Sequence, residues 1–174
     1  MNTSETMLIE FREEAATTKR VLDRVPADRL GWKPHERSMS LGQLALHIAT
    51  VPGSIAKITK PEVFDVSTSN FAPPMPADKE EIEAALAQSV REVEETLQET
   101  TEGMAQEDWH LMFGETELAR QPRASVRRSL MLNHWYHHRG QLAVYLRMLD
   151  VPVPSIYGPS ADENPFSGKT QTGR

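Results

Sequence analysis

The chain of 174 residues contains no cysteine. It can therefore form no disulfide, offer no thiolate to a metal ion and use no cysteine as a nucleophile. Any thiol chemistry must use a thiol that a substrate brings to the protein.

Long apolar segments are also missing from the sequence. No run approaches the roughly 18 apolar residues that indicate a membrane-spanning helix. The N-terminal segment MNTSETMLIEF has no basic stretch followed by an apolar core, so we do not interpret it as a signal peptide. These absences favour a cytoplasmic protein without a membrane partner.

Positive charge is scarce, with 19 Lys and Arg against 25 Asp and Glu and a net charge of −6. Nucleic-acid binding requires clustered Lys and Arg. The one basic cluster, residues 120–128, fits better as the N-terminal flank of a helix. We therefore expect a small-molecule partner and no nucleic acid.

Four segments repeat apolar residues at helical spacing and predict amphipathic helices. The predicted helices cover residues 3–25, residues 40 onward, residues 78–101 and residues 122–150. Each of the first three carries a capping signature, in which Asn, Ser or Asp is followed three residues later by Glu or Gln. These pairs are Asn2 with Glu5, Ser40 with Gln43, and Asp78 with Glu81.

Proline and glycine mark the connections between these helices. Pro52 and Gly53 predict either a kink in the second helix or its early end, with the segment SIAKI as a continuation. Residues 60–77 carry four prolines and predict a long connection. Residues 105–120, around Gly114, predict a short hairpin.

Together these segments predict an all-α fold, a four-helix bundle with a long crossover between the second and third helices. We expect a single domain over residues 1–163 and a flexible C-terminal tail over residues 164–174.

The segment LNHWYHHRGQ, residues 132–141, places three histidines on the fourth helix. His134 and His138 lie four residues apart and share the face toward the bundle interior, where both could bind one metal ion. His137 is offset from that direction, and we predict that it is not a ligand. The pair alone is a weak signal, because helix histidines are often satisfied by hydrogen bonds.

His47 strengthens the metal interpretation, because it shares the apolar face of the second helix with Leu44 and Val51. A lone histidine there is more often a hydrogen-bonded core residue. Three inward histidines would be costly to satisfy separately, whereas one divalent cation satisfies all three. A His-Glu-x-x-His zinc motif and paired Glu-x-x-His di-iron motifs are both absent from the sequence.

The segments LGWKPHERSMSLGQLALHIA, LNHWYHHRGQLAVYLRMLDVPVP and IYGPSADE together resemble the DinB-like family of bacterial proteins. The resemblance implies a four-helix bundle, a metal triad of His47, His134 and His138, and often a homodimer. It implies zinc, nickel or iron as the metal, and we favour zinc or nickel. It also relates the chain to S-transferases that use bacillithiol, mycothiol or glutathione, and to a maleylpyruvate isomerase.

Three histidine ligands leave an open coordination position, which is typical of catalytic metal sites. The leading hypothesis is an enzyme that activates a low-molecular-weight thiol or water at this metal. Gln141, one turn after His138, is the candidate catalytic residue beside it. The alternatives are a non-catalytic metal or small-molecule binding bundle and an interaction bundle without metal.

Four further side chains carry expectations. We expect Gln43 to cap its helix, although it could also face the metal site, and Trp32 to pack the connector onto the bundle. Arg139 is expected in solvent or at an interface. Tyr157 could fold back so that its hydroxyl reaches the site.

Overall fold

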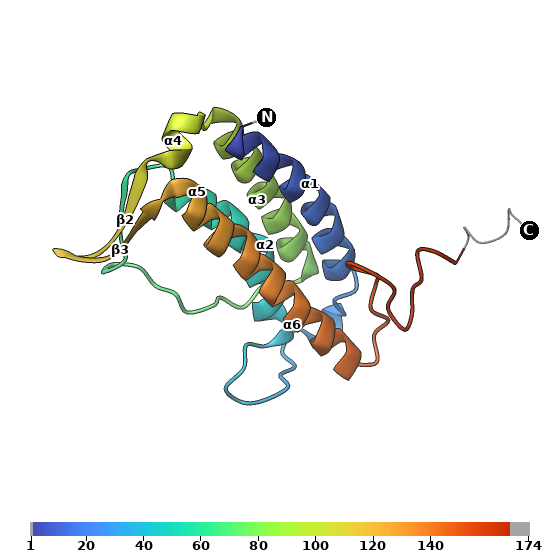
Figure 1. Ribbon diagram of the computed structural model, residues 1–174. Coiled ribbons are helices and arrows are strands. Elements are labelled where there is room, and N and C mark those ends of the chain that lie inside the picture. The colour runs from blue at the N-terminus through green and yellow to red at the C-terminus, as the bar shows by residue number, and fades with distance from the viewer. Residues whose placement is uncertain (1, 168–174) are drawn as a thin grey trace, which may run out of the picture.

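Four long helices with a small sheet at one side make up the structure, a computed structural model that describes residues 2–167 (Figure 1). The first three long helices are α1 (Thr3–Leu22), α2 (Leu41–Ile58) and α3 (Lys79–Glu99). The fourth is continuous through three segments, α5 (Arg123–Val126), the π-helical η2 (Arg127–Asn133) and α6 (His134–Met148). Short helices in the connections are η1 (Ala27–Arg29) and α4 (Glu102–Gln106).

The prediction of an all-α fold is wrong, because three strands form a mixed sheet beside the bundle. They are β1 (Val63–Asp65), β2 (Asp108–Phe113) and β3 (Thr116–Pro122), in the order β1-β2-β3. The β2–β3 hairpin confirms the one expected around Gly114, whose φ of 57° suits a two-residue turn. β1 pairs in parallel with β2 from within the long crossover. Such a short strand depends on a distant partner and leaves no periodic signal in its own segment.

The predicted capping signatures are confirmed at all three helices. The side chains of Asn2 and Ser40 each accept a hydrogen bond from the backbone N–H three residues on, and the side-chain oxygens of Glu5 and Gln43 each accept one from the backbone N–H of the cap residue. The third helix differs slightly, because the Glu81 carboxylate accepts from the backbone N–H of Ala77 instead of Asp78. These local bonds determine where the helices begin.

α2 continues through Pro52 and Gly53 to Ile58, so neither residue ends the helix. A proline cannot donate to the carbonyl four residues earlier, and here that carbonyl, on Ile48, accepts a 2.9 Å hydrogen bond from the Trp135 indole of α6. The Gly53 N–H donates to Ser89 Oγ of α3 at 2.7 Å. A Cβ at position 53 would lie 2.8 Å from Ser89 Cα, so the glycine permits close contact between α2 and α3.

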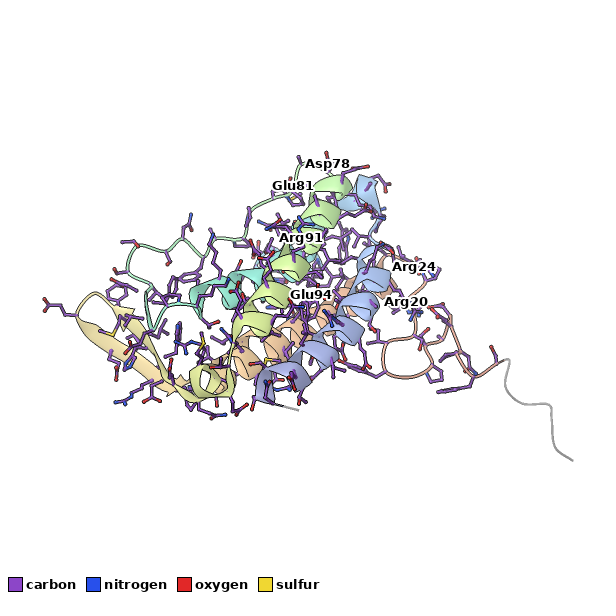
Figure 2. All side chains as sticks on the ribbon, turned by 90° about the horizontal axis from the view of Figure 1, so that it is seen from above. Arg20, Arg24, Asp78, Glu81, Arg91 and Glu94 are labelled. Atoms are coloured by element: carbon purple, nitrogen blue, oxygen red, sulfur yellow. The ribbon has the colours of Figure 1, made fainter. Side chains whose placement is uncertain are left out.

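The core lies between the four long helices, and charged residues cover their outer faces. Phe11 of α1 stacks on Trp135 with ring centroids 5.3 Å apart, and both side chains are fully buried. Figure 2 shows charged side chains along the outer faces of α1 and α3. Arg12 and Glu94 join these two helices through a 2.6 Å ion pair. The apolar stripes predicted from helical spacing therefore face inward.

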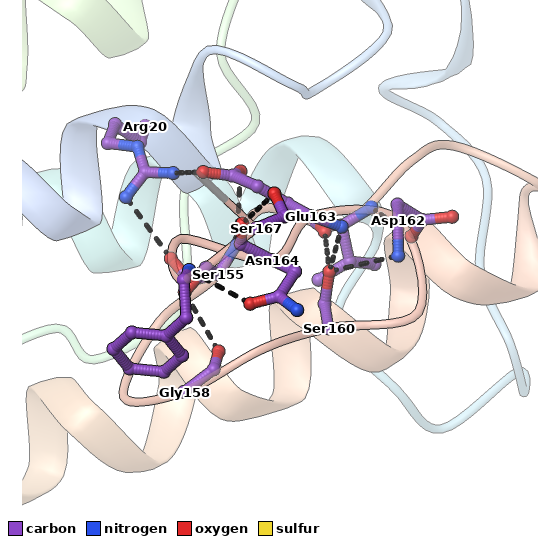
Figure 3. A network of polar contacts seen from close by, with 10 residues as sticks. Arg20, Ser155, Gly158, Ser160, Asp162, Glu163, Asn164 and Ser167 are labelled. Atoms are coloured by element: carbon purple, nitrogen blue, oxygen red, sulfur yellow. Dashed lines mark hydrogen bonds and ion pairs between the residues drawn. The ribbon is translucent and has the colours of Figure 1, made fainter. Parts of the chain in front are cut away.

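The segment after α6 returns to α1 and is held by polar contacts (Figure 3). Arg20 of α1 pairs with Glu163 and donates to the Ser155 carbonyl. Asp162 accepts from the Val153 N–H and pairs with Arg147. Residues 164–167 of the predicted tail form a turn, and residues 168–174 lie outside the described residues. Within residues 2–167, none of the helices combines the length and apolarity that crossing a bilayer requires.

Candidate metal centre and its pocket

α2 and α6 bring the three predicted histidines together. His47, His134 and His138 each offer one ring nitrogen, and these three atoms all lie within 4.8 Å of one another. The ring centroids are 4.4 to 5.4 Å apart, and all three side chains are half-buried. We call this group the histidine triad. In the described part of the chain it is the one cluster of its kind that could hold a metal ion.

The backbone next to two of these histidines is tied together by the same contact that accommodates Pro52. Trp135 follows His134, Ile48 follows His47, and the indole N–H donates to the Ile48 carbonyl. The π-helical η2 ends at Asn133, directly before His134. Because π-helical turns are wider than α-helical ones and are frequent at functional sites, this segment influences the direction in which His134 leaves the helix.

Hydrogen bonds within the triad determine which nitrogens carry protons. His138 Nδ1 lies 2.7 Å from the Gln141 side-chain oxygen, which can only accept, so His138 donates from Nδ1. Its Nε2 then accepts from His134 Nε2, which lies 2.7 Å away. Among the described side chains, the buried His134 Nδ1 is one of two polar atoms left without a hydrogen-bond partner.

Burial keeps the triad neutral. Burial, reinforced by the neighbouring His138 and His134, lowers the pKa of His47 from 6.5 to about 4. Burial also lowers the pKa of His134, against the raising effect of the Leu130 backbone carbonyl. The pKa of His138 falls for the same main reason, and its bond to Gln141 opposes the shift. Neutral imidazoles present the lone pairs that metal ions need.

The triad fits a divalent transition metal. Its three ligands are neutral nitrogens, and imidazole suits zinc, nickel and iron. If both rings held a metal ion through these Nε2 atoms, the proton that His134 and His138 now share in their hydrogen bond would have to leave. His134 can then carry its proton on Nδ1, the atom that lacks a partner in the described structure. Three protein ligands leave at least one open position.

Other predicted residues lie outside the triad. His137 is exposed and only touches the His138 ring edge, with centroids 5.1 Å apart. Gln43 caps α2, as expected, and its amide donates to the Pro73 carbonyl of the crossover. Trp32 packs edge-on against Tyr145, as expected of a residue that anchors the connector.

Arg139 corrects a prediction, because it is only 1% exposed and lies neither in solvent nor at a free surface. It forms a 2.6 Å ion pair with Glu14 of α1 and donates to Thr18 Oγ1. Tyr157 folds back over the bundle, but its hydroxyl contacts Arg139 and Glu14 instead of the histidines. α1 packs on this face of α6, and single-helix periodicity did not reveal that contact.

A cavity of about 480 Å³ opens beside the triad, with His47 and His134 in its wall. One wall is α2, a second is the sheet with Phe64, Trp109 and Leu111, and a third is the crossover. The helical periodicity of the sequence gives no sign of this pocket. Aromatic residues such as Phe64 in an otherwise irregular connection were the available signal, but their partners come from distant segments.

Comparison with known proteins agrees with this architecture. The family model described as the DinB family matches residues 1–169. A curated relative, uncharacterized protein YrdA of Bacillus subtilis, is 25% identical over 151 residues, which cover 86% of this chain and 85% of the relative. The crystal structure of a DinB-like protein from Bacillus cereus has a TM-score of 0.68 and 26% identity, covering 88% of this chain and 97% of that one.

A second solved structure, a DinB-like protein of B. subtilis called YjoA, also has a TM-score of 0.68. It is 20% identical, and the alignment covers 87% of this chain and 97% of that one, so it shows the shared fold. The family match spans the bundle, the sheet and all three histidines. On that basis, this chain is a member of the DinB family.

Proposed function

We propose that the protein binds a divalent metal ion through His47, His134 and His138 and transfers a low-molecular-weight thiol to an electrophilic substrate. The observation that carries this proposal is that His47 and His134 belong to the triad and also line the adjoining cavity. A reacting molecule in the cavity would therefore lie next to the metal. Zinc or nickel is the metal that we favour.

The bound metal would supply a Lewis-acid position that lowers the pKa of a coordinated thiol. The three histidines hold that position, and the hydrogen bond from His138 to Gln141 fixes the direction of the His138 ring. This contact supports a positioning role for Gln141, and a direct role on the substrate stays a prediction. The cavity holds the electrophile and limits its contact with water.

The proposed transfer is a substitution. The thiol sulfur forms a bond to the electrophilic carbon, the leaving group departs with the bonding electron pair, and the thiol proton passes to solvent. No cysteine of the chain can serve as an intermediate carrier, because the sequence contains none.

The test is conjugation of bacillithiol, mycothiol or glutathione to monochlorobimane by zinc- or nickel-loaded protein. We expect a rate above the uncatalysed background with at least one thiol, and loss of that rate in His138→Ala. His35→Ala is the control, because His35 is exposed and lies in the connector before α2. Background rates with every thiol in fully metallated protein would contradict the proposal and favour a non-catalytic binding protein.

The homodimer and the cytoplasmic location remain separate predictions. Light scattering of the purified protein at several concentrations measures the first.

A further inference from the structure

We infer that the cavity beside the triad, which we call the triad pocket, accepts an uncharged apolar molecule, so that the electrophile belongs to that class. This inference rests on the proposed thiol transfer and adds its second substrate. The metal-bound thiol would bring the polar and anionic groups, and the pocket would hold the apolar partner.

The lining of the triad pocket is the first observation. Apart from the two neutral histidines, the described residues that line it carry no ionisable side chain. Val51 and Ile55 of α2 face Phe64, Trp109 and Leu111 of the sheet across the cavity. Away from the wall formed by the histidines, an anion placed here would lose its hydration without gaining a partner of opposite charge, and this cost is large in an apolar environment.

The nearby cations provide a second observation, because each is directed elsewhere. Arg123 and Arg127 are buried and donate to the Thr59 carbonyl at the C-terminal end of α2. Lys57 and Lys60 line a different depression, which they share with Glu92. Among the described residues, none of these cations lines the triad pocket.

Size and polar groups also match a small ligand. About 480 Å³ lies within the roughly 300–1,000 Å³ typical of small-molecule sites. Thr50, Ser54 and Asn70 are the neutral polar side chains in the lining, enough to orient a ligand that carries one or two polar atoms. The metal centre lies at one wall, so a bound molecule would present part of its surface to the thiol.

A matched pair of probes tests the charge preference. N-phenyl-1-naphthylamine is neutral, and 1-anilinonaphthalene-8-sulfonate has the same aromatic framework with one added negative charge. We expect protein freed of metal by chelation, in which no cation lies in the pocket wall, to bind the neutral probe at least about tenfold more tightly, measured by probe fluorescence titration. Equal or tighter binding of the sulfonate, or no saturable binding of the neutral probe, would overturn the inference.

Variants of Ser54 locate the binding site. Ser54 lines the triad pocket and is exposed enough to be replaced without unfolding α2. Ser54→Asp should weaken binding of the neutral probe about fivefold more than Ser54→Asn does. Asp and Asn have nearly the same shape, and only Asp adds a charge. Leu118→Glu, on an exposed position of β3, is the control and should bind like the wild type. Equal affinities for the two Ser54 variants would contradict this location.

The conjugation assay separates this inference from the proposed function. If the protein prefers the neutral probe but conjugates no thiol, the proposed transfer reaction is wrong and the inference of an apolar binding pocket is supported. Conjugation that favours a carboxylated electrophile over a neutral one, with no probe preference, would leave the transfer reaction and overturn the apolar pocket.

Discussion

His138 and Arg139 are neighbours in α6, but they face two regions that differ in how completely their polar groups are paired. On the α1 side, the Arg139 guanidinium is paired with Glu14 and hydrogen-bonded to Thr18 and Tyr157. On the α2 side, all three histidines are half-buried, and two hydrogen bonds join His134 to His138 and His138 to Gln141. Within the described residues, His47 has only ring contacts to the other two, and His134 Nδ1 has no partner.

The difference indicates that the Arg139 ion pair is structural and that the histidine triad is a candidate metal site. A buried charge that is fully paired inside the protein has no remaining capacity for a ligand. The triad is only partly satisfied, and its histidines are held neutral by burial. The same helix therefore stabilises the bundle on one face and offers metal ligands on the other.

The largest expected effect comes from removing one histidine of the triad. His47→Ala should reduce bound zinc or nickel to a small fraction of the wild-type amount, because two nitrogens cannot replace three. Elemental analysis of protein purified without chelators measures this. His35→Ala and His110→Ala are controls and should keep their metal. Equal metal in all three variants would show that the triad assignment is wrong.

Removing the ion pair between Glu14 and Arg139, on the α1 side of α6, should lower stability and leave the metal bound. Glu14→Ala leaves the Arg139 charge buried and without its carboxylate, which should lower the free energy of unfolding by about 3 kcal/mol. Urea denaturation measures the change. Glu13→Ala, exposed on α1, is the matched control. A Glu14→Ala protein that lost metal but kept its stability would reverse the comparison between the two faces.

A smaller effect is expected from replacing Gln141, because it contacts His138 of the triad and is not itself one of the three metal-binding residues. Gln141→Ala should weaken metal affinity by about 10- to 100-fold, because the His138 ring loses its orienting acceptor. Competition with a colorimetric chelator gives the affinity. Gln121→Ala, on exposed β3, serves as the control. Unchanged affinity in Gln141→Ala would leave Gln141 without a positioning role.

The smallest expected effect is the pH dependence of the metal-free protein. The unfolded chain protonates His47 near pH 6.5, but in the folded protein its pKa is about 4. Between these values the unfolded state binds more protons, so acidification lowers the free energy of unfolding. The expected loss between pH 7 and pH 5 is on the order of 1 kcal/mol after allowance for partial solvent screening. Urea denaturation at several pH values gives the free energy of unfolding of chelated wild type and of His47→Asn. This free energy should fall less steeply with acidification in the variant, and an identical pH dependence would argue against a buried neutral His47.

Several features were predictable because their causes are local. Asn2 and Ser40 are followed at the right distance by residues that complete a cap, and the structure forms both capping boxes. His134 and His138 share a face because four residues make about one helical turn. His47 could be added from its place in an apolar stripe. The β2–β3 hairpin also followed from a local turn at Gly114.

Other features depend on which segments meet, and no local pattern carries that information. The three-residue β1 exists because β2 offers it a parallel edge. Arg139 is buried because Glu14 and Thr18 of α1 lie opposite it, although its helix position alone indicated solvent or an interface. Pro52 does not end α2 because Trp135 of α6 occupies the carbonyl that the proline leaves without a donor.

The sequence by itself therefore determined the helices, their caps and the face on which each histidine lies, because these depend on bonds between residues a few positions apart. Only the tertiary structure decided how the triad is protonated, which buried charge is paired and where the apolar pocket lies. Those properties arise from burial and from contacts between α1, α2, α6, the sheet and the crossover. Burial and long-range pairing follow from the packing of distant segments, which is a property of the whole chain.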